Sequence, residues 1–238
     1  MNIAVIIAGG VGSRMGANIP KQFVLVEGKP VLFYTLEAFE RHPMVDAIEL
    51  VLIEGWEEDV LRWKQQYGIT KLKWIVKGGA SGQESIRNGV FGLEDKCAAE
   101  DIVIIHDGIR PLVQPEVLDD VICKARQFGT GVTSMPYNEQ IFLVDEQDPT
   151  VTRKYIPRET LRRVATPQAY RFELLDQAYH EAFEKKIGIY GSSYTNTMMT
   201  ELGHELHFAA GSDKNLKLTT PGDLEIFRAY LASRWDCR

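Results

Sequence analysis

A glycine-rich turn that carries a cation follows the first apolar run of the chain. Residues 8–16 read AGGVGSRMG, and Lys21 follows Arg14 by seven positions. Glycines after a strand let backbone N–H groups approach phosphate oxygens, whose charge nearby cations offset. The spacing fits neither the Rossmann pattern nor the Walker pattern, since no G-x-G-x-x-G and no Gly-Lys-Ser/Thr occurs here. The turn predicts a phosphate site, although a glycine turn with solvated basic side chains has the same composition.

Two further segments carry charged residues beside apolar runs. Asp107 and Arg110 lie in HDGIRP, directly after the apolar run DIVII. They are predicted at the carboxyl end of a buried strand, although an Asp turn with a surface ion pair also suits these residue types. Lys217 lies in KNLKLT, where alternation predicts a strand and a lysine most often faces solvent.

The elements that must position these residues alternate between strands and helices. Apolar runs predict strands and 3.6-residue periodicity predicts helices, with Ser81 and Glu84 in capping-box spacing at one helix start. The predicted strands are 3–8, 47–53, 71–79, 101–107, 204–211 and 214–219, and the predicted helices are 30–43, 57–68, 81–94, 115–129, 172–186 and 221–235. This order predicts an α/β fold with a doubly wound, mostly parallel sheet, which binds ligands at the carboxyl ends of its strands.

The pattern changes between about residues 133 and 165. IFLV and TVTRKYI are short extended runs joined by the turn-like DEQDPT, which predicts an inserted β-hairpin arm. With 238 residues, the chain is otherwise expected to form one domain.

Bulk composition favours a protein that is neither nucleic-acid-binding nor membrane-bound. The net charge is −6, so any phosphate binding must be local. The apolar run 3–8 is too short to span a bilayer. Cys97, Cys123 and Cys237 have no metal-like spacing, and their odd number favours free thiols in the cytoplasm.

Five motifs together resemble one enzyme family. AGGVGSRM, PKQF, HDGIRP, ATPQAY and NLKLTTPGDL occur in this order, and they are similar to the cytidylyltransferases that include the methylerythritol-phosphate and ribitol-5-phosphate enzymes. The resemblance spans nearly the whole chain. It implies a Rossmann-like fold, CTP and Mg²⁺ as cosubstrates, a polyol phosphate as acceptor, and a homodimer whose arms complete each other's active sites.

The resemblance also implies roles for individual residues. The cations around the α-phosphate and the pyrophosphate would be Arg14, Lys21 and Lys217. The nucleotide would lie against Ala8, Gly9, Gly10, Gly12, Gly78, Gly79, Ser85 and Gly108. The acceptor would contact Asp107, Arg110, Gln140, Arg158, Thr166 and Thr195, with Arg158 and Thr166 reaching the neighbouring subunit's acceptor. Mg²⁺ would be held mostly by the triphosphate, with Asp107 near it. His106 receives no role as a general base, because a phosphate nucleophile is already ionised at neutral pH.

Three segments depart from the family pattern. Gly82 stands where an arginine is usual, Glu139-Gln140 replaces an Asp-Thr of the arm, and Asn196 replaces the acid of a TDEA segment. Groups that contact hydroxyls decide polyol identity. We therefore expect a pentitol or related alditol phosphate as acceptor and a CDP-alditol as product. The alternatives are a 2-C-methyl-D-erythritol 4-phosphate enzyme of isoprenoid synthesis and a nucleotide-binding protein without turnover.

Overall fold

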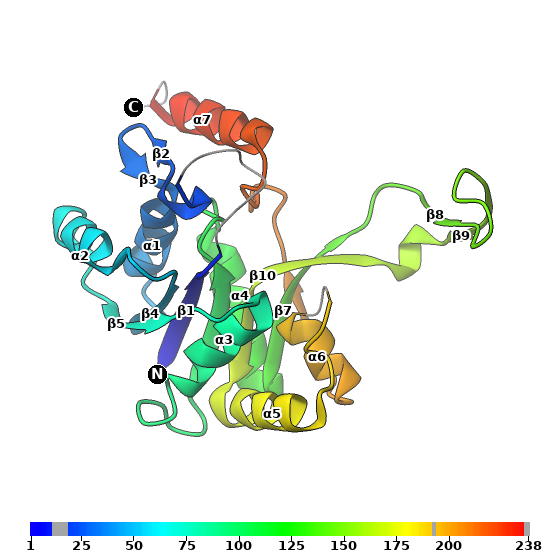
Figure 1. Cartoon of the computed structure of the whole chain (residues 1–238), viewed down its shortest axis with the longest axis horizontal. Helices are drawn as coiled ribbons and strands as arrows, with labels where there is room; N and C mark the ends of the chain where they lie inside the picture. Colours follow the sequence, from blue (N-terminus) through cyan, green and yellow to red (C-terminus); the bar gives the residue numbers. More distant parts are fainter. Residues whose placement is uncertain (11–18, 192–193, 236–238) are drawn as a thin grey trace.

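The structure is a computed structural model that describes residues 1–10, 19–191 and 194–235. Its centre is a seven-stranded sheet in the order β11-β7-β10-β6-β1-β4-β5 (Figure 1). The strands are β1 (Asn2–Ala8), β4 (Ala47–Leu52), β5 (Leu72–Lys77), β6 (Ile102–Asp107), β7 (Thr130–Pro136), β10 (Arg162–Arg171) and β11 (Phe208–Ala210). All neighbours pair in parallel except β10, which runs antiparallel to both β6 and β7. The α/β, mostly parallel fold expected from the sequence is confirmed.

Helices cover both faces of this sheet. They are α1 (Val31–Arg41), α2 (Glu57–Gln66), α3 (Gly82–Phe91), α4 (Pro115–Phe128), α5 (Phe172–Lys185), α6 (Thr195–Glu201) and α7 (Pro221–Trp235). Alternate residues of β1 pack on opposite sides, so one apolar core lies under α1, α2 and α4 and the other under α3, α5 and α6. Burial on both faces explains why β1 and β6 are continuous apolar runs rather than alternating ones. A third, smaller core joins α7 to the short hairpin β2 (Leu25–Val26) and β3 (Lys29–Pro30).

The helix ends match their local sequence signals. The Ser81 hydroxyl accepts a hydrogen bond from the Glu84 N–H at 3.1 Å, which caps α3 as its spacing predicts. The Glu84 carboxylate accepts from the Ala80 N–H rather than from Ser81, so the reciprocal half of the capping box is shifted by one residue. Gly129 ends α4 with a φ of +83°, a conformation that favours glycine.

The prediction of a strand at 214–219 is wrong. This segment has no strand pairing, and the Leu218 N–H donates to the Ile109 carbonyl in a single cross-connection. Its alternating pattern arises because Leu218 is buried against α7 while Lys217 faces the site described below. Helix α6 was not predicted, since its seven residues are too few for a periodic signal.

The inserted arm is a two-stranded hairpin formed by β8 (Ile141–Val144) and β9 (Thr152–Ile156). It extends away from the body of the protein from the ends of β7 and β10 (Figure 1). Phe142, Val144 and Tyr155 are exposed on it although they are large apolar residues.

Among the described residues, no helix has the length and apolar character needed to cross a membrane.

Candidate active site

A cavity of about 810 Å³ opens at the carboxyl edge of the parallel strands. Its wall combines the ends of β1 and β6, the loop between β5 and α3, part of β10, the start of α6 and the segment before α7. Ile7 of β1 lies opposite Asp107 of β6 in the sheet register, so the two loops that follow these strands start level with each other. The volume is in the usual range for a small-molecule site.

Two glycine segments meet at one side of the cavity. A Cβ on Gly9 would lie 3.2 Å from Gly78 Cα and 3.0 Å from Ser85 Oγ, so neither loop has room for side chains there. The Gly79 N–H donates to Ser85 Oγ at 3.0 Å, and that hydroxyl donates to the Ser81 carbonyl at 2.9 Å. This close approach gives a physical reason for glycine at these positions.

Gln22 lines the cavity as well, although its sequence pattern predicts no role for it. Its side chain is buried, and Nε2 donates to the carbonyls of Ala8 at 2.8 Å and Gly10 at 2.9 Å. It therefore fixes the backbone where the glycine turn leaves β1. Gln22 follows Lys21 in the PKQ motif, and that adjacency was the available signal.

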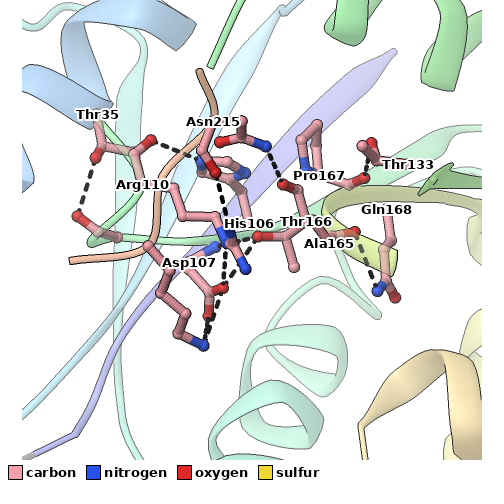
Figure 2. A network of polar contacts seen from close by, with 12 residues as sticks. Thr35, His106, Asp107, Arg110, Thr133, Ala165, Thr166, Pro167, Gln168 and Asn215 are labelled. Carbon is pink, nitrogen blue, oxygen red and sulfur yellow. Dashed lines mark hydrogen bonds and ion pairs between the residues drawn. The ribbon is translucent and has the colours of Figure 1, made fainter. Parts of the chain in front are cut away.

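Asp107 lines the same cavity and is the centre of a charged cluster, whose bonds to Arg110 and Thr166 are drawn in Figure 2. Arg110 Nε donates to its Oδ2 at 2.9 Å, and Lys217 Nζ lies 3.1 Å from its Oδ1. Thr166 of β10 accepts from the Asp107 N–H at 3.1 Å and lies 3.2 Å from Oδ2. One carboxylate thus carries two cations, which leaves a local excess of positive charge beside the glycine loops.

The turn that carries Asp107 and Arg110 is fixed by bonds from several elements. The Gly108 N–H donates to the Ile7 carbonyl at 2.9 Å, and the Gly108 carbonyl accepts from the Thr35 hydroxyl of α1 at 2.9 Å. His106 Nε2 lies 3.1 Å from the Arg110 carbonyl, which makes Nε2 the protonated nitrogen. These bonds hold the ion pairs in one geometry.

The electrostatics of this turn separate its two titratable residues. Burial raises the pKa of Asp107, but Lys217 and Arg110 outweigh it and hold that pKa well below its usual range. Burial lowers the pKa of His106 to about 4. Asp107 is therefore a permanent anion and His106 a neutral, fully buried ring.

Most of the residues expected at the site line this cavity. They are Ala8, Gly9, Gly10, Lys21, Gly79, Ser85, Asp107, Arg110, Thr166, Thr195 and Lys217. Gly78 and Gly108 do not line it, but each lies directly behind a lining loop. Gly12 and Arg14 lie outside the described residues.

Gln140 and Arg158 are placed elsewhere. Both line a separate cavity of about 420 Å³ in the arm, beside Phe142 and Tyr155. Within one chain, the structure does not bring them to the Asp107 cluster. Thr166 is on β10 of the main sheet, next to Asp107 of its own chain, rather than on the projecting hairpin.

Several lining residues had no predicted role. Tyr194, Asn196 and Thr219 lie at the start of α6 and before α7. Gly82 also lines the cavity, and a Cβ there would meet no described atom within 4 Å, so the place of the missing arginine is open space.

Asp107 is the one carboxylate among the described residues that line the cavity. The group with metal-ligand proximity in the described chain, Glu94, Asp176 and His180, lies outside that lining. Both oxygens of Asp107 are already engaged by Lys217, Arg110 and Thr166, so a hard cation at this cavity would take most of its ligands from a bound nucleotide.

Comparisons with known proteins agree on one family. The sequence model of IspD, 2-C-methyl-D-erythritol 4-phosphate cytidylyltransferase, matches residues 2–233. The ribitol-5-phosphate cytidylyltransferase of Lacticaseibacillus paracasei is 55% identical over 234 residues, covering 98% of this chain and 99% of that protein. The 2-C-methyl-D-erythritol 4-phosphate cytidylyltransferase of Geobacter metallireducens is 35% identical over 237 residues, covering 97% of each.

A solved structure shows the same fold. The 2-C-methyl-D-erythritol 4-phosphate cytidylyltransferase of Francisella tularensis superposes with a TM-score of 0.76 at 25% identity, covering 95% of this chain and 98% of that one. The match to the family extends over nearly the whole chain, including every described segment that lines the cavity. This protein therefore belongs to the IspD family of cytidylyltransferases, which are nucleotidyltransferase enzymes.

Proposed function

We propose that the protein transfers CMP from CTP to a pentitol phosphate, with ribitol 5-phosphate as the first choice, and releases pyrophosphate. The observation that carries this proposal is the juxtaposition of the glycine loops with the Asp107 cluster across one cavity. A triphosphate needs backbone donors and cations, and a phosphorylated acceptor needs a second cationic group near it.

The chemistry requires positioning and charge stabilisation rather than a nucleophilic side chain. A phosphate oxygen of the acceptor attacks the α-phosphorus of CTP, a P–O bond forms, and the bond to the pyrophosphate oxygen breaks. Negative charge grows on the equatorial and leaving oxygens. Lys217 and Lys21 both line the cavity and supply fixed cations to these oxygens. Arg110 holds Asp107 through Nε and the Asn215 carbonyl through Nη1, at 2.9 and 2.8 Å, and its Nη2 is the nitrogen left for the acceptor phosphate.

Mg²⁺ would neutralise charge on the triphosphate when bound, with Asp107 as its protein neighbour. Arg110, Lys217 and Thr166 hold that carboxylate in place and keep it ionised.

The choice of a pentitol over methylerythritol phosphate rests on the relative at 55% identity and on the cavity wall. Asn196 lines the cavity where the methylerythritol enzymes are expected to carry an acid. An amide donates and accepts hydrogen bonds, whereas a carboxylate only accepts, so the two walls suit different hydroxyl patterns.

A pyrophosphate-release screen tests this proposal. CTP, UTP, GTP and ATP are each combined with ribitol 5-phosphate, 2-C-methyl-D-erythritol 4-phosphate, arabinitol phosphate and glycerol 3-phosphate, with and without EDTA. We expect release with CTP and ribitol 5-phosphate, a product of the mass of CDP-ribitol, and loss of turnover with EDTA. Preference for the methylerythritol substrate would favour the isoprenoid enzyme. Binding of CTP without turnover on any acceptor would favour a nucleotide-binding protein.

We also propose that the protein is a cytoplasmic homodimer in which the arms meet. The arm exposes Phe142 and Tyr155 at 54% and 68% of their surface, and Arg158 lies beside them at the arm cavity. Apolar side chains on a projecting hairpin are stabilised by covering them. An arm contributed by a partner would also place Gln140 and Arg158 near a catalytic cavity that they cannot reach in their own chain.

Phe142→Asp is expected to convert the dimer into a monomer, because it places a charge in the centre of the apolar face. Light scattering gives the mass, and Leu61→Asp on α2, also exposed at 48%, is the control that leaves the dimer intact. A monomeric wild-type protein at assay concentration would contradict the proposal. Detection of the protein in a membrane or secreted fraction of the cell would contradict the cytoplasmic location.

A further inference from the structure

A buried chain of hydrogen bonds connects α3 to α6 behind the cavity. Gln83 Nε2 donates to the Gly188 carbonyl at 2.9 Å, and Gln83 Oε1 lies 3.2 Å from the Tyr179 hydroxyl. The same hydroxyl lies 2.8 Å from Thr195 Oγ1. The side chains come from α3, α5 and α6, and all three residues are at least 95% buried.

The direction of every bond in this chain follows from its first member. A carbonyl can only accept, so Gly188 fixes the Gln83 amide with its nitrogen toward Gly188 and its oxygen toward Tyr179. Tyr179 must then donate its single O–H to Gln83. The bond between Tyr179 and Thr195 therefore has the Thr195 hydroxyl as donor.

The consequence for Thr195 is a defined polarity. Its one hydrogen is used by Tyr179, so toward a ligand this hydroxyl can only accept. Burial raises the pKa of Tyr179 above its ordinary value, so the phenol keeps its proton. The donors and acceptors in this series of hydrogen bonds therefore stay the same as the pH changes. An ionised phosphate oxygen, which also only accepts, cannot hydrogen-bond with the Thr195 hydroxyl.

Asn196 is the neighbouring group on the same wall. The residue is 9% exposed and lines the cavity, and its side-chain amide has no hydrogen-bond partner among the described residues. Neither of its amide atoms is among the fully buried groups that lack a partner, so the amide is open to the cavity, where a ligand can fill both of its bonding roles. Polyol hydroxyls both donate and accept.

We propose that Gln83 and Tyr179 are positioning residues, which fix the Thr195 hydroxyl as a hydrogen-bond acceptor toward the polyol, and that the Asn196 amide bonds a neighbouring hydroxyl of the same polyol. This inference rests on the proposed function. It also orients the acceptor: the phosphate lies toward Arg110 and Lys217, where donors are available, and the carbon chain lies along α6.

The first test is Tyr179→Phe, which removes one oxygen and frees the Thr195 hydroxyl to rotate. We expect the acceptor KM to rise about tenfold while the KM for CTP stays within about twofold. Tyr190→Phe is the matched control, because Tyr190 is exposed and does not line the cavity. Thr195→Val and Asn196→Ala provide a second measurement that leaves Tyr179 in place, and all variants are checked for an unchanged melting transition.

The second test distinguishes recognition of the polyol hydroxyls from a structural role. Each variant is assayed with ribitol 5-phosphate, with its monodeoxy analogues and with glycerol 3-phosphate. With ribitol 5-phosphate, each variant should raise the acceptor KM. With the analogue that lacks the hydroxyl bound by the substituted group, the KM of Asn196→Ala or Tyr179→Phe should be within about twofold of wild type. An equal penalty on all acceptors, or an equal rise in the KM for CTP, would overturn this inference alone. A wild-type enzyme that uses none of the polyol phosphates would overturn the proposed function and this inference with it.

Discussion

Lys217→Ala is expected to lower kcat by about 10²–10³ with little change in the KM for CTP. The reason is that charge develops on the α-phosphate during the reaction, so a cation placed for that charge acts mainly in the transition state. Contacts on both its backbone and its side chain fix the position of Lys217 in the cavity wall. Leu218 on its C-terminal side is buried and bonded to Ile109 through its backbone, and Asp107 fixes the ammonium group.

If Lys217 had only a structural role, Lys217→Ala would lower the melting temperature together with kcat. The contacts around Lys217 argue against that result. Its side chain is 31% exposed, so solvent screens part of its ion pair with Asp107. Loss of Lys217 also leaves Asp107 paired with Arg110. The variant should therefore keep its melting temperature while losing turnover.

The measurement is steady-state pyrophosphate release at saturating acceptor, with unfolding followed in parallel. Lys214→Ala is the matched control, since Lys214 is an exposed lysine of the same segment and does not line the cavity. A Lys217→Ala enzyme with kcat within about threefold of wild type would show that the fixed charge comes from elsewhere.

The parts of this site that the sequence predicts are those set by local rules. β1 and β6 are apolar runs long enough to be buried strands, and parallel strands bring the residues that follow them to one edge. These two facts predict that the glycine turn converges with Asp107 and Arg110, and the described start of the turn, Ala8 to Gly10, lines the same cavity as both residues.

The parts that were missed depend on long-range contacts. Lys217 was predicted at the site, but the strand predicted around it is absent, because its segment is held by the Leu218 backbone bond, by Asn215 bonds to Arg110 and Thr166, and by packing against α7. Gln83 and Tyr179 are 96 positions apart in the chain, and each is an ordinary residue of an amphipathic helix. No local signal distinguishes such residues from other core positions.

Glu49 is a buried acid that no local rule explains. It lies in the middle of β4, opposite Val5 of β1, with 0% of its surface exposed. Neither of its carboxylate oxygens has a hydrogen-bond partner among the described residues. Burial raises its pKa from 4.5 to about 8, with Lys96 opposing that shift and Asp95 adding to it. The folded protein therefore holds Glu49 protonated at pH values where the unfolded chain releases the proton.

The sign of the pH dependence follows from this difference. Between pH 4.5 and about 8, the folded state binds more protons at Glu49 than the unfolded state does, so the free energy of unfolding falls as the pH rises. The loss amounts to roughly 2 kcal/mol by pH 6 and roughly 4 kcal/mol by pH 8. His106 acts in the opposite direction, because its pKa of about 4 makes acid destabilising below pH 6.5.

Glu49→Gln is therefore expected to remove the fall in the free energy of unfolding at rising pH. The fall at acid pH, which comes from His106, should remain. In urea unfolding at pH 5 to 9, the free energy of unfolding of the variant should rise relative to that of wild type as the pH rises. The difference should reach roughly 4 kcal/mol at pH 8. Glu54→Gln is the control, because Glu54 lies just beyond the same strand with its side chain 73% exposed. Parallel curves for wild type and Glu49→Gln would mean that Glu49 ionises normally in the folded protein. Diverging curves would show that β4 carries an uncharged acid, with proton uptake as part of folding.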